Sequence, residues 1–133
     1  MRRVLLVEDS ASMRAFVRAA LTSSVALGEL EIAEAQSGFD ALRLLPRGVW
    51  DLVITDINMP DINGLELISF IKKSEAHKTT PILIISTASS ERDRERGMTL
   101  GASGYLVKPF TTEALTQQVL EQMGAASASG AHA

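Results

Sequence analysis

The sequence predicts a single α/β domain, in which a parallel β-sheet is covered by helices on both faces. Short, continuously apolar runs alternate along the chain with segments whose apolar residues recur at the helical period. Unbroken apolar runs are typical of strands that lie between two layers of helices, because neither face of such a strand meets solvent. The chain has 133 residues, enough for one hydrophobic core but not for two.

The first half of the chain supplies two strands and two helices. A strand is expected over residues 4–7, and Ser10 can cap the helix after it by accepting a hydrogen bond from a free N–H group of the first turn. A second strand is expected over residues 30–35, before a short helix over about 39–45 that Pro46 stops. The apolar residues of the first helix share one face, which we expect to be buried: Met13, Phe16, Val17, Ala20 and Leu21.

The second half supplies three more strands and the helices between them. The third strand, over residues 51–56, ends at Asp56, the fourth covers residues 82–86 after Pro81, and the fifth covers residues 104–107. Two helices carry apolar residues for the core, namely Leu65, Leu67, Ile68, Phe70 and Ile71 after the third strand and Leu115, Val119, Leu120 and Met123 after the fifth.

Residues 89–100, between the fourth and fifth strands, favour a helix of a different kind. Most of its residues are charged, and its apolar content is nearly confined to Met98 and Leu100. Such charges form an ordinary solvated helix face with pairs at i,i+4 spacing. Because this helix can bury little apolar surface, we expect it to be weakly held.

The last residues, 124–133, are small side chains and one histidine. None is a large apolar group that could offset the conformational entropy lost on ordering. We therefore expect a folded domain over residues 1–123 and a disordered tail over 124–133.

Composition narrows the possible partners and the compartment. Lysine and arginine number 13 against 16 acidic residues, a net charge of −3 with no basic tract, so we expect no direct binding to nucleic acid. No segment approaches the roughly 18 apolar residues of a membrane span, and Glu8 and Asp9 end the first apolar run. The chain has no cysteine, which agrees with a reducing cytoplasm. We expect a soluble, cytoplasmic monomer.

Charged side chains lie at the ends of three expected strands. Glu8 and Asp9 follow the first strand, Asp56 ends the third, and Lys108 follows the fifth. Because the carboxyl ends of parallel strands meet at one edge, these groups converge if the strands are neighbours. Crowded carboxylates repel one another unless a cation lies among them, and Mg²⁺ binds through one or two carboxylates with water and phosphate oxygens. The pattern indicates a site where a carboxylate attacks a phosphoryl group.

Four fragments in order, each at a strand end, resemble the CheY-like receiver domains of two-component response regulators: 7–10, 55–64, 84–86 and 101–110. The resemblance runs from about Arg3 to Met123. It implies a doubly wound five-stranded parallel sheet in the flavodoxin-like order 2-1-3-4-5, with five helices. Asn58, together with the run from Gly104 to Phe110, favours the stand-alone, chemotaxis-type branch.

The resemblance also implies a role for each site residue. Asp56 is expected to be the phosphoacceptor. Asp9 and Asp56 would bind Mg²⁺ directly, Glu8 through water and Asn58 through its backbone carbonyl. The remaining roles fall on Lys108, which pairs with the phosphate and precedes a cis Pro109, on Ser86, the hydroxyl that moves onto the phosphoryl group, and on Tyr105, the aromatic that follows it.

Ser86 has a competitor for the role of switch hydroxyl, because Thr87 stands beside it. Ser86 lies 22 residues before Lys108, which is the family spacing, and the strand period also favours it. Thr87 remains the alternative.

The activity that the resemblance implies is that of a switch, which catalyses only its own phosphorylation and dephosphorylation. A histidine kinase would donate the phosphoryl group to Asp56. A downstream protein would then bind the face formed by the fourth helix, the fifth strand and the last helix.

Two other functions remain possible from the sequence. The chain would be a phosphorylation-independent interaction module if the pocket were a relic. The second alternative is a phosphatase with an aspartyl nucleophile, as in the haloacid dehalogenase group. Those enzymes require a second Asp two residues after the nucleophile, where this chain has Asn58. A flavin site is disfavoured because Glu8 and Asp9 would repel a phosphate. Among the remaining residues, we expect His77 and His132 to be solvated and Trp50 to pack over a sheet edge.

Overall fold

The computed structural model describes residues 1–132 and the side chains of residues 1–124. In this part of the chain five parallel strands form one sheet in the order β2-β1-β3-β4-β5. The strands are β1 (Arg2–Val7), β2 (Leu30–Ala35), β3 (Leu52–Asp56), β4 (Ile82–Thr87) and β5 (Gly104–Lys108). The α-helices are α1 (Ala11–Thr22), α2 (Gly38–Leu44), α3 (Gly64–Lys73), α4 (Glu91–Leu100) and α5 (Thr112–His132). The predicted fold class and strand order are confirmed.

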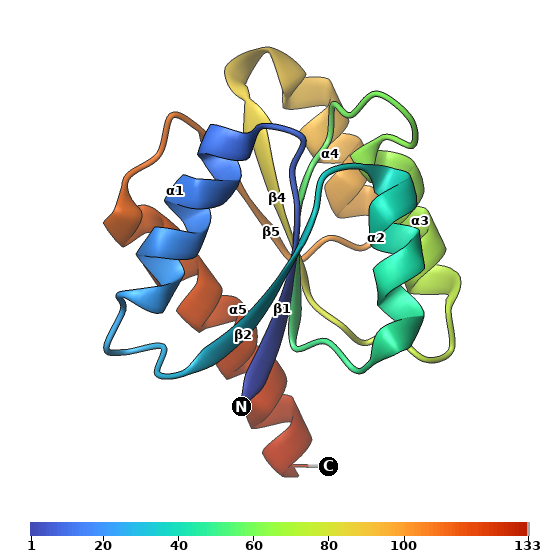
Figure 1. Ribbon diagram of the computed structural model, residues 1–133. Helices are drawn as coiled ribbons and strands as arrows, with labels where there is room; N and C mark the ends of the chain where they lie inside the picture. The colour runs from blue at the N-terminus through green and yellow to red at the C-terminus, as the bar shows by residue number, and fades with distance from the viewer. Residues whose placement is uncertain (133) are drawn as a thin grey trace.

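Helices cover both faces of the sheet. Figure 1 shows α1 and α5 on one side of the strands and α2, α3 and α4 on the other. The alternating side chains of the strands separate accordingly into two cores: Leu5 and Val7 of β1 belong to the cluster beneath α2 and α3, whereas Val4 and Leu6 belong to the cluster beneath α1 and α5. This explains why the strands read as unbroken apolar runs.

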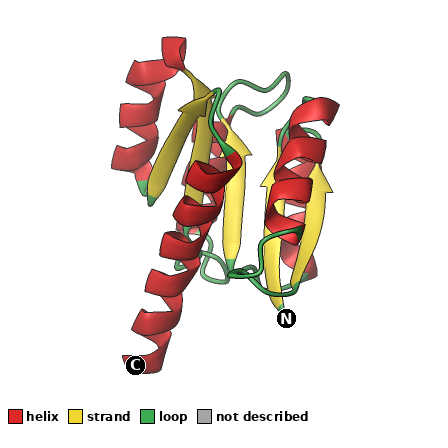
Figure 2. Ribbon diagram, turned by 90° about the vertical axis from the view of Figure 1, so that its left-hand side faces the viewer, coloured by secondary structure: helices red, strands yellow, loops and turns green. Residues whose placement is uncertain are grey.

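The strand register brings the three charged strand ends to one edge. Val7 of β1 pairs with Thr55 of β3, and Asp56 pairs with Ile85 of β4. Thr87, the last residue of β4, pairs with Lys108 of β5. The strands run in one direction, so that their carboxyl ends share the edge at the top of Figure 2. This edge is where the expected site residues meet.

Local sequence signals fix several element ends. The hydroxyl of Ser10 accepts a hydrogen bond from the Met13 N–H group at 3.2 Å, which confirms the predicted cap of α1. The second helix gives way after Leu44 to a single 3-10 turn, Leu45–Arg47, which contains Pro46. The turn forms there because proline has no N–H group to continue the α-helical hydrogen bonds. The bond between Lys108 and Pro109 is cis, as predicted.

Two expected core residues lie at the surface. Phe16 of α1 is 38% exposed, and its ring packs against that of Phe110 with 5.9 Å between the ring centroids. Phe70 of α3 is 51% exposed. Val17 and Leu21 of α1 are buried as predicted.

The prediction for His77 is wrong, whereas Trp50 is confirmed as a packing residue, within the core cluster beneath α2 and α3. His77 is buried, because the segment after α3 folds back in turns: the N–H groups of His77 and Lys78 both donate to the carbonyl of Ser74. Trp50 is 3% exposed, and its indole N–H donates to the carbonyl of Leu45.

The fourth helix has the sparse packing that its sequence indicates. Gly97 is its buried residue, and a side chain there would meet the Cδ1 atom of Ile84 at 2.4 Å. Ser90, which precedes the helix, makes no side-chain capping hydrogen bond to it. α4 therefore approaches the sheet through a glycine rather than through large side chains.

The last helix carries the core residues Leu115, Val119 and Met123, all buried. Described side chains end at Gly124, so the expectation for residues 124–133 stays a prediction, and His132 falls among them. None of the described helices is both long enough and apolar enough to cross a membrane.

Candidate functional site

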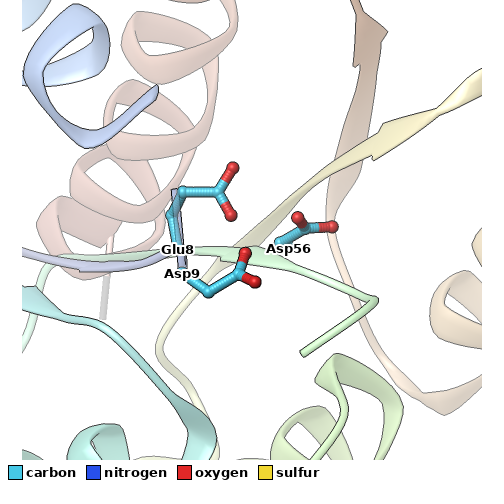
Figure 3. Close-up of side chains that lie close together, drawn as sticks. All are labelled: Glu8, Asp9 and Asp56. Atoms are coloured by element: carbon cyan, nitrogen blue, oxygen red, sulfur yellow. The ribbon is translucent and has the colours of Figure 1, made fainter. Parts of the chain in front are cut away.

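Three carboxylates converge at the carboxyl edge of the sheet. Glu8 and Asp9 follow β1, and Asp56 is the last residue of β3. One oxygen from each lies within 4.8 Å of the others. In Figure 3 the three carboxylates point toward a common space. Glu8 and Asp56 are buried, whereas Asp9 is exposed and forms the open side of the cluster.

Lys108 neutralises the buried half of the cluster. Its Nζ atom donates to Glu8 Oε1 at 2.6 Å and to Asp56 Oδ2 at 3.0 Å. The lysine reaches both groups because β5 ends at Lys108, on the same edge as β1 and β3. Among the residues that the structure describes, Lys108 is the ion-pair partner of this cluster, so its carboxylates outnumber the cation paired with them.

The pKa values of Glu8 and Lys108 reflect both burial and the charges of their neighbours. Burial raises the pKa of Glu8 to about 7, and the neighbouring Asp56 adds to the effect, while the hydrogen bond from Lys108 opposes it. Burial alone would lower the pKa of Lys108, but its hydrogen bonds to Glu8 and Asp56, with their charges, raise it instead. Lys108 therefore stays protonated, and ionised Glu8 is disfavoured unless further positive charge arrives.

The loop after β3 fixes the carboxylate of Asp56. Its Oδ1 atom accepts hydrogen bonds from the N–H groups of Ile57 at 2.6 Å and Asn58 at 3.3 Å. The loop then returns, so that the Gly64 N–H donates to the carbonyl of Ile57 at 2.7 Å. A Cβ atom on Gly64 would lie 2.2 Å from the backbone oxygen of Asp56, so only glycine fits this approach.

Asn58, expected to contribute a backbone carbonyl, has its side chain engaged elsewhere. Its amide Nδ2 donates to the hydroxyl of Ser90 at 3.1 Å. Ser90 stands at the start of α4 and is buried. Residues 57–63, which we call the acceptor loop after the role expected of Asp56, are thereby joined to the corner between β4 and α4.

Ser86 and Thr87 have different surroundings. Ser86 is fully buried at the end of β4, next to the register partner of Asp56, and its hydroxyl has no hydrogen-bond partner among the described residues. Thr87 is exposed, and its hydroxyl lies within hydrogen-bond distance of the hydroxyls of Ser89 and Ser90. Among the described residues, the Ser86 hydroxyl is therefore free to take a new partner, whereas the Thr87 hydroxyl already has two neighbours.

Tyr105 lies outside the acidic cluster. It pairs with Ile84 in the β-sheet and is 47% exposed, so its ring faces solvent beside α4. The structure thus brings together Glu8, Asp9, Asp56 and Lys108, with Asn58 and Ser86 on the adjoining chain segments, and leaves Tyr105 on the surface.

The donor set fits a hard divalent cation such as Mg²⁺. Three carboxylates offer oxygen ligands, the type that Mg²⁺ prefers. Glu8 Oε2 is buried and has no hydrogen-bond partner among the described residues. A cation or its bound water would satisfy that oxygen and would oppose the two effects that raise the pKa of Glu8, burial first and the neighbouring Asp56 second.

Three residues that support the site were not among the site residues predicted from the sequence. Arg14 of α1 donates from Nη1 to the carbonyl of Glu8 at 2.7 Å. Ser90 accepts from Asn58, as described. Asp61, in the acceptor loop, accepts from the N–H groups of Gly38 and Phe39, each at 3.0 Å. Only Asp61 had a signal, because a loop carboxylate is a frequent cap for backbone N–H groups.

Comparison with known proteins places these features in a family. Residues 4–120 match the model of the response regulator receiver domain. The chain is 32% identical over 130 residues to a chemotaxis protein CheY homologue of Campylobacter jejuni, a match that covers 97% of this chain and 98% of that protein.

Solved structures of receiver proteins resemble this chain as well. The chemotaxis response regulator CheY4 of Vibrio cholerae is 34% identical, with a TM-score of 0.82 over 92% of this chain and 98% of that one. The receiver domain of the sensor histidine kinase PA1611 of Pseudomonas aeruginosa, solved with a magnesium ion coordinated in its active site cleft, is 26% identical, with a TM-score of 0.81 over 92% and 98% of the two chains. The chain therefore belongs to the receiver domain family of the response regulators, the phosphoacceptor switches of two-component signalling.

Proposed function

We propose that Asp56 accepts a phosphoryl group from a phosphohistidine of a histidine kinase, with Mg²⁺ present, and that the phosphorylated chain changes its binding to a downstream protein. The observation that carries this proposal is the position of Asp56. Its carboxylate accepts a hydrogen bond from the ammonium group of Lys108 at 3.0 Å and lies beside two further carboxylates that can hold a cation with it. A carboxylate of this kind is a nucleophile flanked by the positive charge that phosphoryl transfer needs.

The transfer forms one bond, from Asp56 to phosphorus, and breaks one bond in the donor. A carboxylate oxygen of Asp56 attacks phosphorus, the P–N bond to the kinase imidazole breaks, and the imidazole leaves with a proton from solvent. The product is an aspartyl phosphate. Mg²⁺, held by Asp9 and Asp56 directly, Glu8 through water and the Asn58 carbonyl, would neutralise the transferred oxygens. Lys108 supplies the fixed positive charge on the other side of the phosphoryl group.

The new phosphoryl group recruits the Ser86 hydroxyl. The burial of Ser86 and its free hydroxyl support this role over Thr87, whose hydroxyl already has serine neighbours. Tyr105 then changes its side-chain orientation. The output is a shift between two populations of the same fold, presented on α4, β5 and α5.

Two further expectations belong to this proposal. The chain acts as a cytoplasmic monomer, and it turns over no substrate other than its own phosphoryl group. Its partners are proteins, a kinase upstream and a target downstream.

The deciding experiment is chemical labelling with a small phosphodonor such as acetyl phosphate. We expect incorporation of phosphate that requires Mg²⁺, that hydroxylamine releases, and that Asp56→Asn abolishes. Asp93→Asn, which removes an aspartate from the surface of α4, is the matched control and should label normally.

Other outcomes would point to the two alternative functions. A chain that takes no label while Asp56→Asn leaves partner binding unchanged would be an interaction module. Steady release of phosphate from a phosphate monoester would indicate an aspartyl phosphatase instead.

A further inference from the structure

Arg94 of α4 contacts two groups that the proposed switch would move. Its Nη1 atom donates a hydrogen bond to the carbonyl of Thr87 at 2.7 Å. Its guanidinium carbon also lies 5.5 Å from the centroid of the Tyr105 ring, within the range of a cation–π contact. Thr87 directly follows Ser86 and ends β4. One side chain thus joins the end of β4 to the aromatic ring of β5.

The same corner is connected to the acceptor loop. The Asn58 amide donates to the Ser90 hydroxyl at 3.1 Å, and that hydroxyl lies 3.3 Å from the hydroxyl of Thr87. A continuous series of contacts therefore runs from the residue two positions after Asp56, through Ser90 and Thr87, to Arg94 and Tyr105. Each contact is made by a side chain that can change its partner.

The ring of Tyr105 is half-exposed, and Arg94 lies over one of its faces. Tyr105 is 47% exposed and, with Arg94 and Met98, lines a surface hollow of about 280 Å³. The helix that carries Arg94 is itself sparsely packed, with Gly97 as its buried residue. Arginine suits both contacts, because its planar guanidinium can stack on a ring while its N–H groups donate in the plane.

We propose that Arg94 is a positioning residue of the switch. While Asp56 is unphosphorylated, Arg94 holds Tyr105 in its half-exposed orientation, because the carbonyl of Thr87 anchors the guanidinium above the ring. Movement of Ser86 displaces that carbonyl, so Arg94 releases the ring and the hollow changes shape. This inference rests on the proposed function, since it requires the end of β4 to move on phosphorylation.

The chain offers a clean measurement, because Tyr105 is its single tyrosine. Biosynthetic 3-fluorotyrosine therefore gives one ¹⁹F resonance, whose chemical shift and change between H₂O and D₂O report the surroundings and exposure of this ring. The variants are Arg94→Ala and, as matched control, Arg96→Ala. Arg96 is an exposed arginine of the same helix whose described ion pair is with Asp93. Phosphate incorporated at Asp56 is measured in parallel.

In unphosphorylated Arg94→Ala, we expect the ¹⁹F chemical shift and its change between H₂O and D₂O to move toward the values of the phosphorylated, unmodified chain. In Arg96→Ala both values should equal those of the unphosphorylated, unmodified chain. The equilibrium between the two ring orientations should shift by about two- to fivefold, the worth of an exposed cation–π contact. Labelling of Asp56 should be retained in both variants.

Two results would overturn the inference alone, with Asp56 labelled normally: an unchanged resonance in Arg94→Ala, or an equal change in Arg94→Ala and Arg96→Ala. If the unmodified chain takes no label at Asp56, the proposed function fails, and the role of Arg94 in it fails with it.

Discussion

The three carboxylates of the acidic cluster are chemically similar, yet their surroundings give them different properties. Glu8 is fully buried beside Lys108, and its pKa is raised to about 7. Asp56 is buried but accepts two backbone hydrogen bonds, and Asp9 is exposed. The backbone thus fixes the orientation of the Asp56 carboxylate, whereas Asp9 lies on the open side of the cluster. This difference arises from neighbours rather than from residue type, so the sequence identifies the three groups without ranking them.

Asp9→Asn should weaken the stabilisation that Mg²⁺ gives to the folded chain. An ion that binds only the folded state raises the free energy of unfolding, by about 2.7 kcal/mol at a concentration 100 times its dissociation constant. We expect Asp9→Asn to shift the midpoint of a magnesium titration, followed by thermal unfolding, to a concentration at least about tenfold higher. Asp93→Asn should titrate like the unmodified chain. Equal midpoints for all three proteins would contradict the assignment of Asp9.

Asp61 should contribute stability that depends on pH. Desolvation would raise its pKa, but the N–H groups of Phe39, Ile62 and Gly38 outweigh this and lower the pKa from its ordinary 3.8 to about 2. Because the folded-state pKa is the lower one, the stabilisation is complete above about pH 4 and is lost as the pH falls toward 2. Urea unfolding from pH 2 to 5 should show the difference between the unmodified chain and Asp61→Asn shrinking with acidity. A difference that stays constant across this range would refute the prediction.

At the scale of elements, apolar content distinguishes α4 from the helices that bury large side chains against the sheet. The buried residues of α1 are Val17, Ala20 and Leu21, and its first turn is capped by Ser10. In α4, all of whose residues are described, the buried residue is Gly97. The sequence predicted this contrast because apolar periodicity reports burial directly. It missed the exposure of Phe16, since the pairing of its ring with Phe110 depends on how α1 and the loop before α5 meet.

Backbone amides of α4 should exchange with solvent faster than those of α1. Few buried contacts mean a small free energy of local opening, and a difference of about 1.4 kcal/mol already gives a tenfold difference in exchange. Hydrogen–deuterium exchange, resolved by residue, should show at least this ratio between residues 95–100 and 15–20. Equal protection in the two helices would mean that contacts other than apolar burial hold α4.

At the scale of the whole molecule, the features that could be predicted are those that follow from the alternation of strands and helices. Alternating strands and helices fix the fold class, and strand direction brings Asp56 and Lys108 to one edge, although they are far apart in sequence. The contacts that join elements through loops did not follow from any pattern. His77, among lysines, gave every local indication of solvent exposure, but the turns after Ser74 bury it. Such contacts depend on the complete fold rather than on local periodicity.

The boundary of the domain can be tested by truncation. The last buried side chain of α5 is Met123, 1% exposed in the core beneath α1 and α5. A chain that ends at residue 123 keeps every described core residue, so its free energy of unfolding should stay within about 0.5 kcal/mol of the full chain. Met123→Ala in the full chain should cost about 2–5 kcal/mol, because it opens a cavity in that core. Urea unfolding compares the two directly. If the truncation lowers the free energy of unfolding as much as Met123→Ala does, residues 124–133 belong to the folded domain. Phosphate labelling of the truncated chain would then show whether the site, at the opposite end of the sheet, depends on them.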